Sequence, residues 1–403
     1  MTRRDAARNL FLWMCGSPLV RGQQQGHTLA ERLPNIEDLV NVFEFEPVAR
    51  ARIPRNSYDF IAGGVDDEWT LERNREGFRR ITFRPRMLVD VSRLDLSLEL
   101  FGRKLEMPIL IAPTAAHQLA HPDGELATVR GAGAAKTVMV VSSNASYPIE
   151  KIGAAATSPF WFQLYAGPDE EGTRERVERA LASGALLVCL TVDTQYNSHR
   201  ERLLRNRISS GTPPGVSAQT PARRSPRQAA QPPNPYRLGQ QFTATLTWSF
   251  FDQLRSWVKA PLIIKGILTP EDARLAIEHG ADGIVVSNHG GRYLEATPST
   301  IEVLPAIVDA VAGKIPVLID GGFRRGTDVL KALAIGAKAV LVGRPPLWGL
   351  GAYGQAGVSR VLSMLETELA LAMGLSGRPN LASIDRSLIR IDGQGAPAPP
   401  TVR

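Results

Sequence analysis

One histidine in the second half of the chain has neighbours that suit proton transfer. His289 lies in the segment Ser287–Arg292, between the pair Ser-Asn and the sequence Gly-Gly-Arg. An imidazole exchanges a proton near neutral pH, and an arginine can hold an anion through two parallel hydrogen bonds. Lone histidines are usually structural, but Arg292 beside this one predicts a general base next to an anion-binding group.

Three more polar side chains follow apolar runs elsewhere in the chain. Asp193 can stabilise the imidazolium that forms when His289 takes a proton, and Tyr165 can hydrogen-bond a substrate oxygen. Lys265 comes near the end of the apolar run that starts at Leu262, and a lysine buried there needs an anion nearby. These residues form a candidate catalytic set if the fold brings them together.

Two segments rich in glycine and arginine have the composition of a phosphate site. They are Asp320–Gly326 and Gly343–Pro345. Glycines let backbone N–H groups approach an anion, and Arg324 and Arg344 can each clamp phosphate oxygens. Asp320 suits a ribose-type hydroxyl better than a phosphate. The alternative interpretation is two tight turns with solvated arginines.

The elements that must position these residues form a regular series. From Pro108 onward, short apolar runs alternate with amphipathic stretches, which predicts alternating strands and helices. The eight runs are Pro108–Ala115, Val138–Ala145, Phe160–Ala166, Ala185–Asp193, Leu262–Ile267, Gly283–Asn288, Val317–Gly321 and Ala339–Gly343. Eight strands alternating with helices predict an α/β fold, a (β/α)8 TIM barrel.

Polar residues or glycines stand at the carboxyl end of every run. In a barrel these ends share one face, and active sites form on that face. They include Thr114, Ser142, Gln163, Thr191, Lys265, Ser287, Asp320 and Gly343. A structural protein has no need of such residues at all eight ends, so the pattern predicts a functional site there.

Local signals mark the helices between the strands. Asp123 and Thr269 are predicted N-caps, and Gly280 and Gly336 are predicted to end helices. The cluster Gly131–Ala135 does not complete a dinucleotide-binding pattern. We expect it to pack a helix on the barrel through small residues.

The predicted organisation is one large domain with extensions. We expect a leader or disordered tail (1–30), an N-terminal helical cap region (31–107), the barrel (108–391) and a C-terminal tail (392–403). Within the cap region, residues 35–50 and 54–63 are predicted helices.

The stretch 208–241, after the fourth strand, lacks apolar periodicity and is rich in Pro, Gln, Arg, Ser and Gly. It predicts a long flexible loop on the active-site face. Arg223, Arg224 and Arg227 leave open a contact with an anionic surface or an electron-acceptor protein, although solvated disorder is the favoured interpretation.

Composition excludes several classes of protein. The chain has 403 residues, 43% of them hydrophobic and 22% charged, which is typical of a globular protein. Its net charge of +7 comes largely from arginines spread along the chain, without a zinc-finger, basic-zipper or aromatic RNA-binding motif. We therefore expect no nucleic-acid partner. No apolar run approaches the ~20 residues of a membrane span, and Cys15 and Cys189 are too few for a disulfide framework. Cys189 is expected to be a buried small apolar residue.

The N-terminus can be compared with a twin-arginine export signal, because Thr2-Arg3-Arg4 precedes the mildly apolar stretch Leu10–Val20. The apolar residues that usually follow the arginine pair are missing, and so is an Ala-x-Ala cleavage site. A cytoplasmic protein with a basic leader is expected, and periplasmic export is the alternative.

The chain resembles the FMN-dependent α-hydroxy-acid oxidases and dehydrogenases, which include glycolate oxidase, lactate oxidase, lactate monooxygenase and mandelate dehydrogenase. The resemblance runs from about Asn35 to Ile391. It is carried, in chain order and with the family's spacing, by Phe-Gln-Leu-Tyr, Leu-Thr-Val-Asp-Thr, Ser-Asn-His-Gly-Gly-Arg and Asp-Gly-Gly-x-Arg-Arg-Gly. Arg-Pro-Arg at 84–86 and Ala-Pro-Thr-Ala at 112–115 match too.

The resemblance implies a role for each member of the catalytic set. His289 would take the hydroxyl proton of a 2-hydroxy acid while the α-hydrogen leaves for flavin N5, as a hydride or by a carbanion route. Asp193 would pair with the protonated His289, and Tyr165 would polarise the substrate hydroxyl. Lys265 would stabilise the anionic reduced flavin near N1 and O2. No metal is implied.

It also implies how FMN and the substrate are held. Arg292, helped by Arg200, would hold the substrate carboxylate. The flavin would contact Pro113, Thr114, Ala115, Ser142, Gln163, Thr191 and Ser287. The ribityl chain and the phosphate would contact Asp320, Gly322, Arg324, Gly343 and Arg344.

The substrate pocket departs from the family pattern at two positions. Phe60 stands where glycolate oxidase has a tyrosine that hydrogen-bonds the substrate carboxylate, and Asn144 stands where it has a tryptophan. Losing a hydrogen bond to a charged group costs about 1.5–3 kcal/mol. We expect a substrate other than glycolate, bulkier or with its carboxylate held differently. Ala115 resembles the residue of the oxidases, whereas lactate monooxygenase has glycine there, which favours release of the keto product.

The expected function is therefore oxidation of an (S)-2-hydroxy acid to the 2-keto acid, with oxygen or another acceptor reoxidising FMN. The resemblance implies a homotetramer. One alternative keeps the flavin and changes the donor to an amine or a modified peptide. A second, a non-enzymatic flavin-binding or scaffold barrel, is disfavoured by the intact set of His289, Asp193, Tyr165 and Arg292.

Overall fold

The computed structural model describes residues 33–167, 169–206 and 246–392. Residues up to Asp38 form one unit and residues from Leu39 onward another, and each is considered by itself. The first unit contributes one short 3-10 helix, η1 (Ile36–Asp38). The leader predicted at 1–30, the loop predicted at 208–241 and the tail from Gly393 onward lie outside the described residues.

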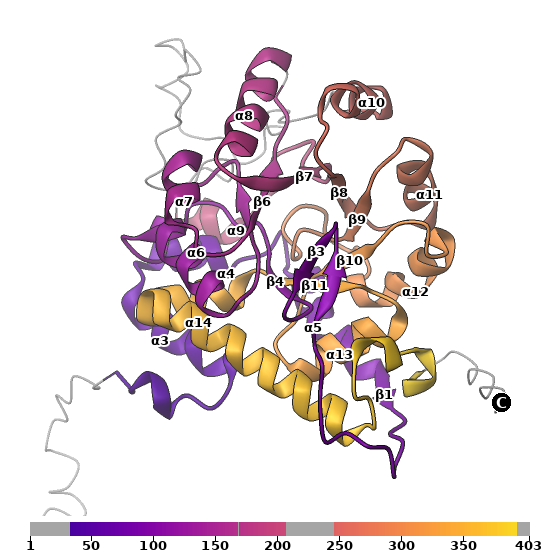
Figure 1. The fold of residues 1–403 in the computed structure, drawn as a ribbon. Coiled ribbons are helices and arrows are strands. Elements are labelled where there is room, and N and C mark those ends of the chain that lie inside the picture. Colours follow the sequence, from indigo (N-terminus) through magenta and orange to yellow (C-terminus); the bar gives the residue numbers. More distant parts are fainter. Residues whose placement is uncertain (1–32, 168, 207–245, 393–403) are drawn as a thin grey trace, which may run out of the picture. The chain divides into compact units, whose positions relative to one another are not determined.

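Eight parallel strands close into a barrel in the second unit (Figure 1). They are β4 (Ile109–Ile111), β5 (Met139–Ser142), β6 (Phe160–Leu164), β7 (Ala185–Thr191), β8 (Leu262–Ile267), β9 (Gly283–Val286), β10 (Val317–Asp320) and β11 (Ala339–Val342). Each lies within one of the eight predicted runs, and the closed order β10-β11-β4-β5-β6-β7-β8-β9 follows the chain. The predicted TIM barrel is confirmed.

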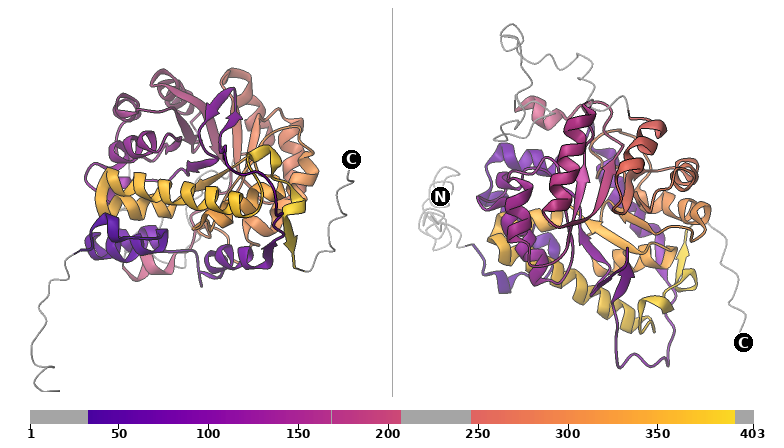
Figure 2. Two further views of the ribbon diagram at one scale, coloured as in Figure 1. Left: turned by 60° about the horizontal axis from the view of Figure 1, so that its bottom comes forward. Right: turned by 45° about the horizontal axis from the view of Figure 1, so that its top comes forward.

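Helices surround the barrel (Figure 2). They are α6 (Gly124–Ala134), α7 (Ile149–Ala155), α8 (Glu170–Ala182), α9 (Glu201–Arg205), α10 (Trp248–Trp257), α11 (Pro270–Glu278), α12 (Thr300–Val311), α13 (Gly326–Ile335) and α14 (Arg344–Leu375). Thr269 caps α11 as predicted, because its side chain accepts a hydrogen bond from the N–H of Asp272. Asp123 occupies the N-cap position of α6, but its side chain makes no capping hydrogen bond.

Two further predictions concern glycines. Gly336 ends α13 with φ +128°. Gly131 lies inside α6, and a Cβ there would come within 2.7 Å of Val358 in α14. Small residues of α6 thus allow close packing as expected, but the partner of Gly131 is helix α14 and not the barrel as predicted.

The region before the barrel differs from its prediction. The single helix expected over 35–50 is wrong, because Asn41 adopts an extended conformation and its side chain caps η2 (Val42–Glu44) instead. α3 (Phe45–Arg52) follows η2, and α4 (Arg55–Ala62) confirms the second predicted helix. α5 (Trp69–Glu76) and η3 (Gly77–Arg80) complete the helical part.

Short strands also occur outside the barrel. β1 (Ile81–Phe83) pairs with β12 (Ile389–Ile391), and β2 (Leu98–Leu100) forms a hairpin with β3 (Arg103–Leu105). The remaining elements are the short helices η4 (His117–Leu119), η5 (Leu381–Ser383) and η6 (Arg386–Leu388). In the described ranges, no helix combines the length and the apolar character that crossing a bilayer requires.

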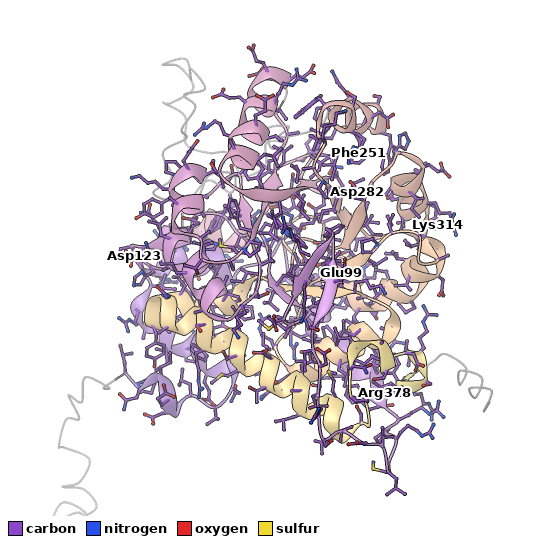
Figure 3. The ribbon with its side chains drawn as sticks, in the orientation of Figure 1. Glu99, Asp123, Phe251, Asp282, Lys314 and Arg378 are labelled. Atoms are coloured by element: carbon purple, nitrogen blue, oxygen red, sulfur yellow. The ribbon has the colours of Figure 1, made fainter. Side chains whose placement is uncertain are left out.

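The core fills the barrel and continues into the β2–β3 hairpin. Leu100 and Leu105 of the hairpin belong to the same buried cluster as the inward-facing strand residues Leu110, Val140, Trp161, Leu187, Ile263, Val285, Leu318 and Leu341. Phe101 packs edge-on against Trp161, with ring centroids 5.5 Å apart. Glu99, on the other face of the hairpin, is exposed to solvent (Figure 3). Lys314, between α12 and β10, is exposed as well. The hairpin therefore closes the end of the barrel where the strands begin.

Candidate active site

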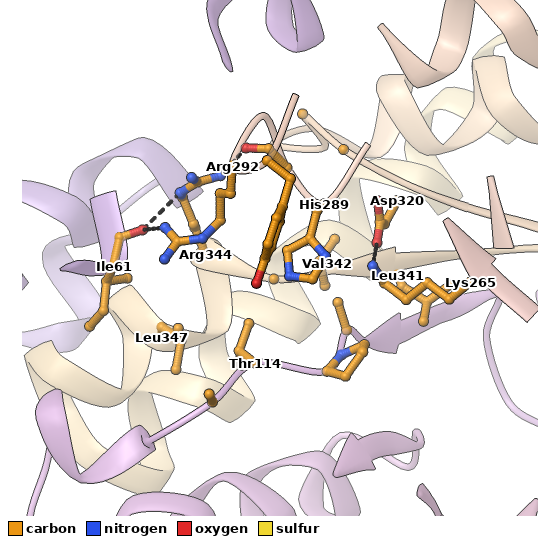
Figure 4. Close-up of a pocket in the computed structure, with 18 of the residues that line it drawn as sticks. Ile61, Thr114, Lys265, His289, Arg292, Asp320, Leu341, Val342, Arg344 and Leu347 are labelled. Carbon is orange, nitrogen blue, oxygen red and sulfur yellow. Dashed lines mark hydrogen bonds and ion pairs between the residues drawn. The ribbon is translucent and has the colours of Figure 1, made fainter. Parts of the chain in front are cut away.

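A cavity opens at the opposite end, where the strands finish (Figure 4). It contains about 1190 Å³ of free space including its mouth, and residues at or after the ends of all eight barrel strands line it. The predicted residues among them are Phe60, Pro113, Thr114, Ala115, Asn144, Tyr165, Arg200, Lys265, His289, Arg292, Asp320, Gly322, Arg324, Gly343 and Arg344. The fold thus brings most of the predicted site to one place.

The backbone after β9 turns sharply to present His289. His289, Gly290 and Gly291 have φ values of +56°, +67° and +71°, a left-handed region that is costly for a residue with a Cβ. The turn is anchored by Asn288, whose side-chain amide is paired in both directions with Asn74 of α5. A Cβ at Gly291 would lie 2.7 Å from the backbone of Leu71, so only glycine fits there.

His289 contacts both of its predicted partners. Its Nδ1 lies 2.9 Å from Oδ1 of Asp193, and its Nε2 lies 3.3 Å from the hydroxyl of Tyr165. A carboxylate on Nδ1 favours the tautomer with the proton on that nitrogen, which leaves the Nε2 lone pair facing Tyr165. Burial lowers the pKa of His289, with Lys265 and Arg292 acting in the same direction and Asp193 opposing them. The neutral imidazole that a general base requires is therefore favoured.

The two partners of His289 are held in complementary protonation states. Burial acts to raise the pKa of Asp193, but the hydrogen-bonded His289 and the charge of Lys265 outweigh it and lower that pKa. Burial, together with the nearby Tyr293 and Asp193, raises the pKa of Tyr165 well above its usual value. Asp193 is thus an anion, and Tyr165 keeps its proton as a hydrogen-bond donor.

Lys265 is buried at the end of β8 and donates to Ser287 Oγ at 2.9 Å. Its Nζ also lies 3.3 Å from a carboxylate oxygen of Asp320. Burial acts to lower the pKa of Lys265, but Asp320 and Asp193 outweigh it and raise that pKa, so the ammonium persists. The anion that the sequence required near this lysine is present. Among the described residues, the second carboxylate oxygen of Asp320 is buried without a hydrogen-bond partner.

Four predicted cofactor contacts lie just outside the cavity lining. Ser142, Gln163, Thr191 and Ser287 are almost fully buried at the strand ends. Ser142 Oγ lies 3.0 Å from Gln163 Oε1, and Gln163 Nε2 donates to Thr191 Oγ1 at 2.9 Å. These polar groups connect neighbouring strands beside the cavity, and their contact with a cofactor stays a prediction.

Arginines dominate the other side of the cavity. Arg292 donates to the carbonyl of Gly63 at 2.8 Å, and Arg344 donates to the carbonyls of Ile61, Gly63 and Gly290 at 2.9–3.1 Å. Burial, followed by repulsion from other arginines, lowers the pKa of Arg292 well below its usual value.

The pKa of Arg324, which follows β10, is lowered more than that of Arg344. Burial, with the neighbouring Arg344 and Arg75, lowers its pKa to about 9, and burial lowers that of Arg344 to about 10. Crowded buried guanidinium groups are costly unless anions share the space. The cavity is therefore built to receive negative charge.

The two departures from the family pattern face this cavity. Phe60 of α4 packs its ring 5.2 Å from the guanidinium carbon of Arg292 and 6.0 Å from that of Arg200. Asn144 follows β5. Phe60 thus occupies the expected place beside the arginines without offering a hydroxyl.

Other lining residues were not predicted. Tyr293, Asn197, Leu347 and Ile61 line the cavity together with parts of the strand-end loops. Tyr293 directly follows Arg292, so its place in the motif was a usable signal. Asn197 and Leu347 carry no comparable signal, because one lies in an irregular loop and the other in an apolar helix.

The chain is similar to known proteins over most of its length. Residues 49–391 match a family described as FMN-dependent dehydrogenase. Glycolate oxidase 1 of Zea mays is 44% identical over 355 residues, which cover 87% of this chain and 96% of that protein. L-lactate oxidase of Nostoc sp. is 45% identical over 364 residues, covering 88% of this chain and 99% of that protein. A soluble mutant of the membrane-associated (S)-mandelate dehydrogenase from Pseudomonas putida matches 88% of this chain and 100% of its own with a TM-score of 0.80 at 37% identity.

Proposed function

The chain belongs to the FMN-dependent dehydrogenase family, and from that premise we propose that it oxidises an (S)-2-hydroxy acid to the 2-keto acid. Similar proteins are oxidases of glycolate and of L-lactate and a dehydrogenase of (S)-mandelate. The observation that carries the proposal is the position of His289, which contacts Asp193 and Tyr165 in a cavity that also contains buried arginines.

FMN is the cofactor of this family, and the residues present fit it. The unpartnered carboxylate oxygen of Asp320 can accept a hydrogen bond from a ribityl hydroxyl. Arg324 and Arg344, whose pKa values are depressed by burial, would hold the phosphate. Thr114 and Lys265 would contact the ring system. Bound FMN supplies the acceptor for the two electrons that leave the substrate.

His289 performs the proton transfer in this proposal. Its Nε2, whose lone pair faces the Tyr165 hydroxyl in this structure, removes the proton of the substrate hydroxyl. Asp193 holds the ring by Nδ1 at 2.9 Å and stabilises the imidazolium that results. The Tyr165 hydroxyl, 3.3 Å from Nε2, points to the position where the substrate oxygen must lie and donates a hydrogen bond to it.

The positively charged residues of the cavity favour a negatively charged substrate. Arg292 and Arg200 hold its carboxylate, which orients the α-carbon for reaction. Lys265 stays protonated and stabilises negative charge that develops on the cofactor. An amine donor lacks the anion that these arginines demand, so the hydroxy acid is the preferred class.

Acceptor, assembly and location are parts of the proposal that the sequence supports. Similarity to named oxidases favours oxygen as the final acceptor, and Ala115 favours release of the keto product. Resemblance to the family favours a homotetramer. For location we propose the cytoplasm, with periplasmic export as the alternative.

The test begins with the purified yellow protein under argon. Its flavin absorbance is recorded while (S)-lactate, (S)-mandelate, glycolate or an amine is added, and oxygen is then readmitted. Bleaching by a 2-hydroxy acid and recovery with oxygen are expected. Bleaching by amines alone, or by no donor, contradicts the proposal.

A further inference from the structure

Tyr293 has no role in the reaction proposed above. It follows Arg292 directly and lines the active-site cavity. Its ring meets that of His289 edge-on, with centroids 4.6 Å apart and an angle of 68°. It also lines a second cavity, which contains about 1150 Å³ of free space including its mouth, together with Trp248 and Phe251. Tyr293 is thus part of the wall beside the catalytic base.

Tyr293 is coupled to the arginine that faces it. The guanidinium carbon of Arg200 lies 5.3 Å from the centre of the Tyr293 ring, and the two side chains are hydrogen-bonded. Arg200 is only 6% exposed, and its Nε donates to Ser198 Oγ at 2.8 Å. Since a guanidinium can only donate, the phenolic oxygen of Tyr293 accepts this hydrogen bond. The Tyr293 O–H is then available to donate to another group.

Phe60 packs against the same two arginines. Its ring is within 6.0 Å of the guanidinium carbons of both Arg200 and Arg292 but offers no donor. A carboxylate has about four acceptor sites and gains from a short hydroxyl donor beside the guanidinium groups. The hydroxyl that is missing at Phe60 is therefore present at Tyr293, reached from the β9 loop instead of from α4.

We propose that Tyr293 is a substrate-binding residue, whose O–H donates to the carboxylate held by Arg200 and Arg292. This inference rests on the proposed function for the identity of the ligand. It assigns the carboxylate contact to a different element of the fold from the one that the family pattern uses. A substrate bound this way has its carboxylate near the β9 loop, which leaves the side of Phe60 and Asn144 for an apolar substituent.

Oxalate is a suitable probe, because it is a carboxylate with no C–H bond to oxidise. Its binding to the FMN-loaded enzyme is titrated through the change in flavin absorbance. Tyr293→Phe is expected to raise the Kd for oxalate about ten-fold or more, the loss of one hydrogen bond to a charged group. Tyr147→Phe is the matched control, since its hydroxyl donates to the carbonyl of Pro122 outside the cavity.

Two further measurements separate binding from a structural role. Lactamide, a neutral hydroxy amide, should bind equally well to the wild type and to Tyr293→Phe. Adding Phe60→Tyr to Tyr293→Phe should recover part of the oxalate affinity. An unchanged oxalate Kd in Tyr293→Phe, or an equal loss for oxalate and lactamide, overturns the inference. Because the titration needs no turnover, oxalate binding that depends on Tyr293 sustains the inference even if no 2-hydroxy acid bleaches the flavin and the proposed function fails.

Discussion

The two ends of the barrel use the same strands for opposite purposes. On β6, Trp161 near the start is buried against Phe101 of the β2–β3 hairpin, while Gln163 and Tyr165 at the other end are polar. Only a few residues along this strand separate the apolar cluster beneath the β2–β3 hairpin from the polar cavity. The starts of the strands contribute stability and their ends contribute chemistry, as is general for this fold.

The ends also differ in how well their groups are satisfied. The buried cluster at the apolar end consists of closely packed hydrophobic side chains. The polar end carries a left-handed His289, crowded arginines and, among the described residues, unpartnered buried oxygens of Asp193 and Asp320. Each of these costs stability unless a ligand compensates. The difference predicts that substitutions at one end change catalysis and at the other end folding.

Replacing the base should have the largest effect. His289→Gln removes the general base, so kcat/KM for the hydroxy acid should fall about 100- to 10,000-fold with the melting temperature nearly unchanged. Steady-state kinetics and thermal unfolding measure the two quantities. His279→Gln, at a histidine that stacks on Trp248 in the outer helices, is the control. A loss of stability that matches the loss of activity would argue against separate roles.

Truncating a side chain at the hairpin end of the barrel should instead lower stability. Trp161→Ala leaves a cavity beneath the hairpin and should lower the free energy of unfolding by about 3–5 kcal/mol. Urea denaturation of the FMN-loaded protein measures this. Tyr165→Phe, just past the other end of the same strand, should change unfolding little and slow flavin reduction. If both substitutions affected the same quantity, the division between the ends would not hold.

Removing FMN should destabilise the protein through its polar end. Ligand at about 100 times its Kd adds about 2.7 kcal/mol to the stability of the folded state. The apoprotein should therefore melt at a lower temperature. In the apoprotein, Arg324→Met should be neutral or stabilising, because burial beside Arg344 and Arg75 disfavours that charge. The same substitution should weaken FMN binding. An apoprotein destabilised by Arg324→Met would show that the charge is satisfied without the cofactor.

The smallest effect concerns pH. Burial lowers the pKa of His289, so the imidazole takes up its inactivating proton only below the ordinary histidine value of 6.5. The acid limb of the kcat/KM profile should lie below that value. Asp193 raises the pKa of His289, so Asp193→Asn should move the limb to still lower pH, besides lowering the rate. A limb above 6.5 would contradict the electrostatics described above.

Much of the polar end could be predicted from the sequence, because each polar residue directly follows an apolar run and the strand ends of a barrel share one face. The place of Phe60 in the pocket could likewise be predicted, because it stands where glycolate oxidase has a substrate-binding tyrosine. The β2–β3 hairpin was not predicted, since β2 and β3 have only three residues each and lie in a region that was expected to be irregular or helical. The break at Asn41 was missed for a similar reason, because a local side-chain cap overrides a helical pattern.

Tyr293 shows a further limit. Its neighbour Arg292 was recognised, but sequence spacing alone does not tell which side chains of a loop turn towards the cavity. The left-handed run from His289 to Gly291 decides that orientation.

The central claim is that the site at the polar end of the barrel dehydrogenates an (S)-2-hydroxy acid. Anaerobic stopped-flow absorbance with (S)-lactate and (R)-lactate tests it most directly, in the wild type and in His289→Gln. We expect (S)-lactate to bleach the flavin of the wild type and (R)-lactate not to, and we expect His289→Gln to retain its FMN but to be bleached far more slowly. Equal bleaching by both enantiomers, or an unchanged rate in His289→Gln, would contradict it.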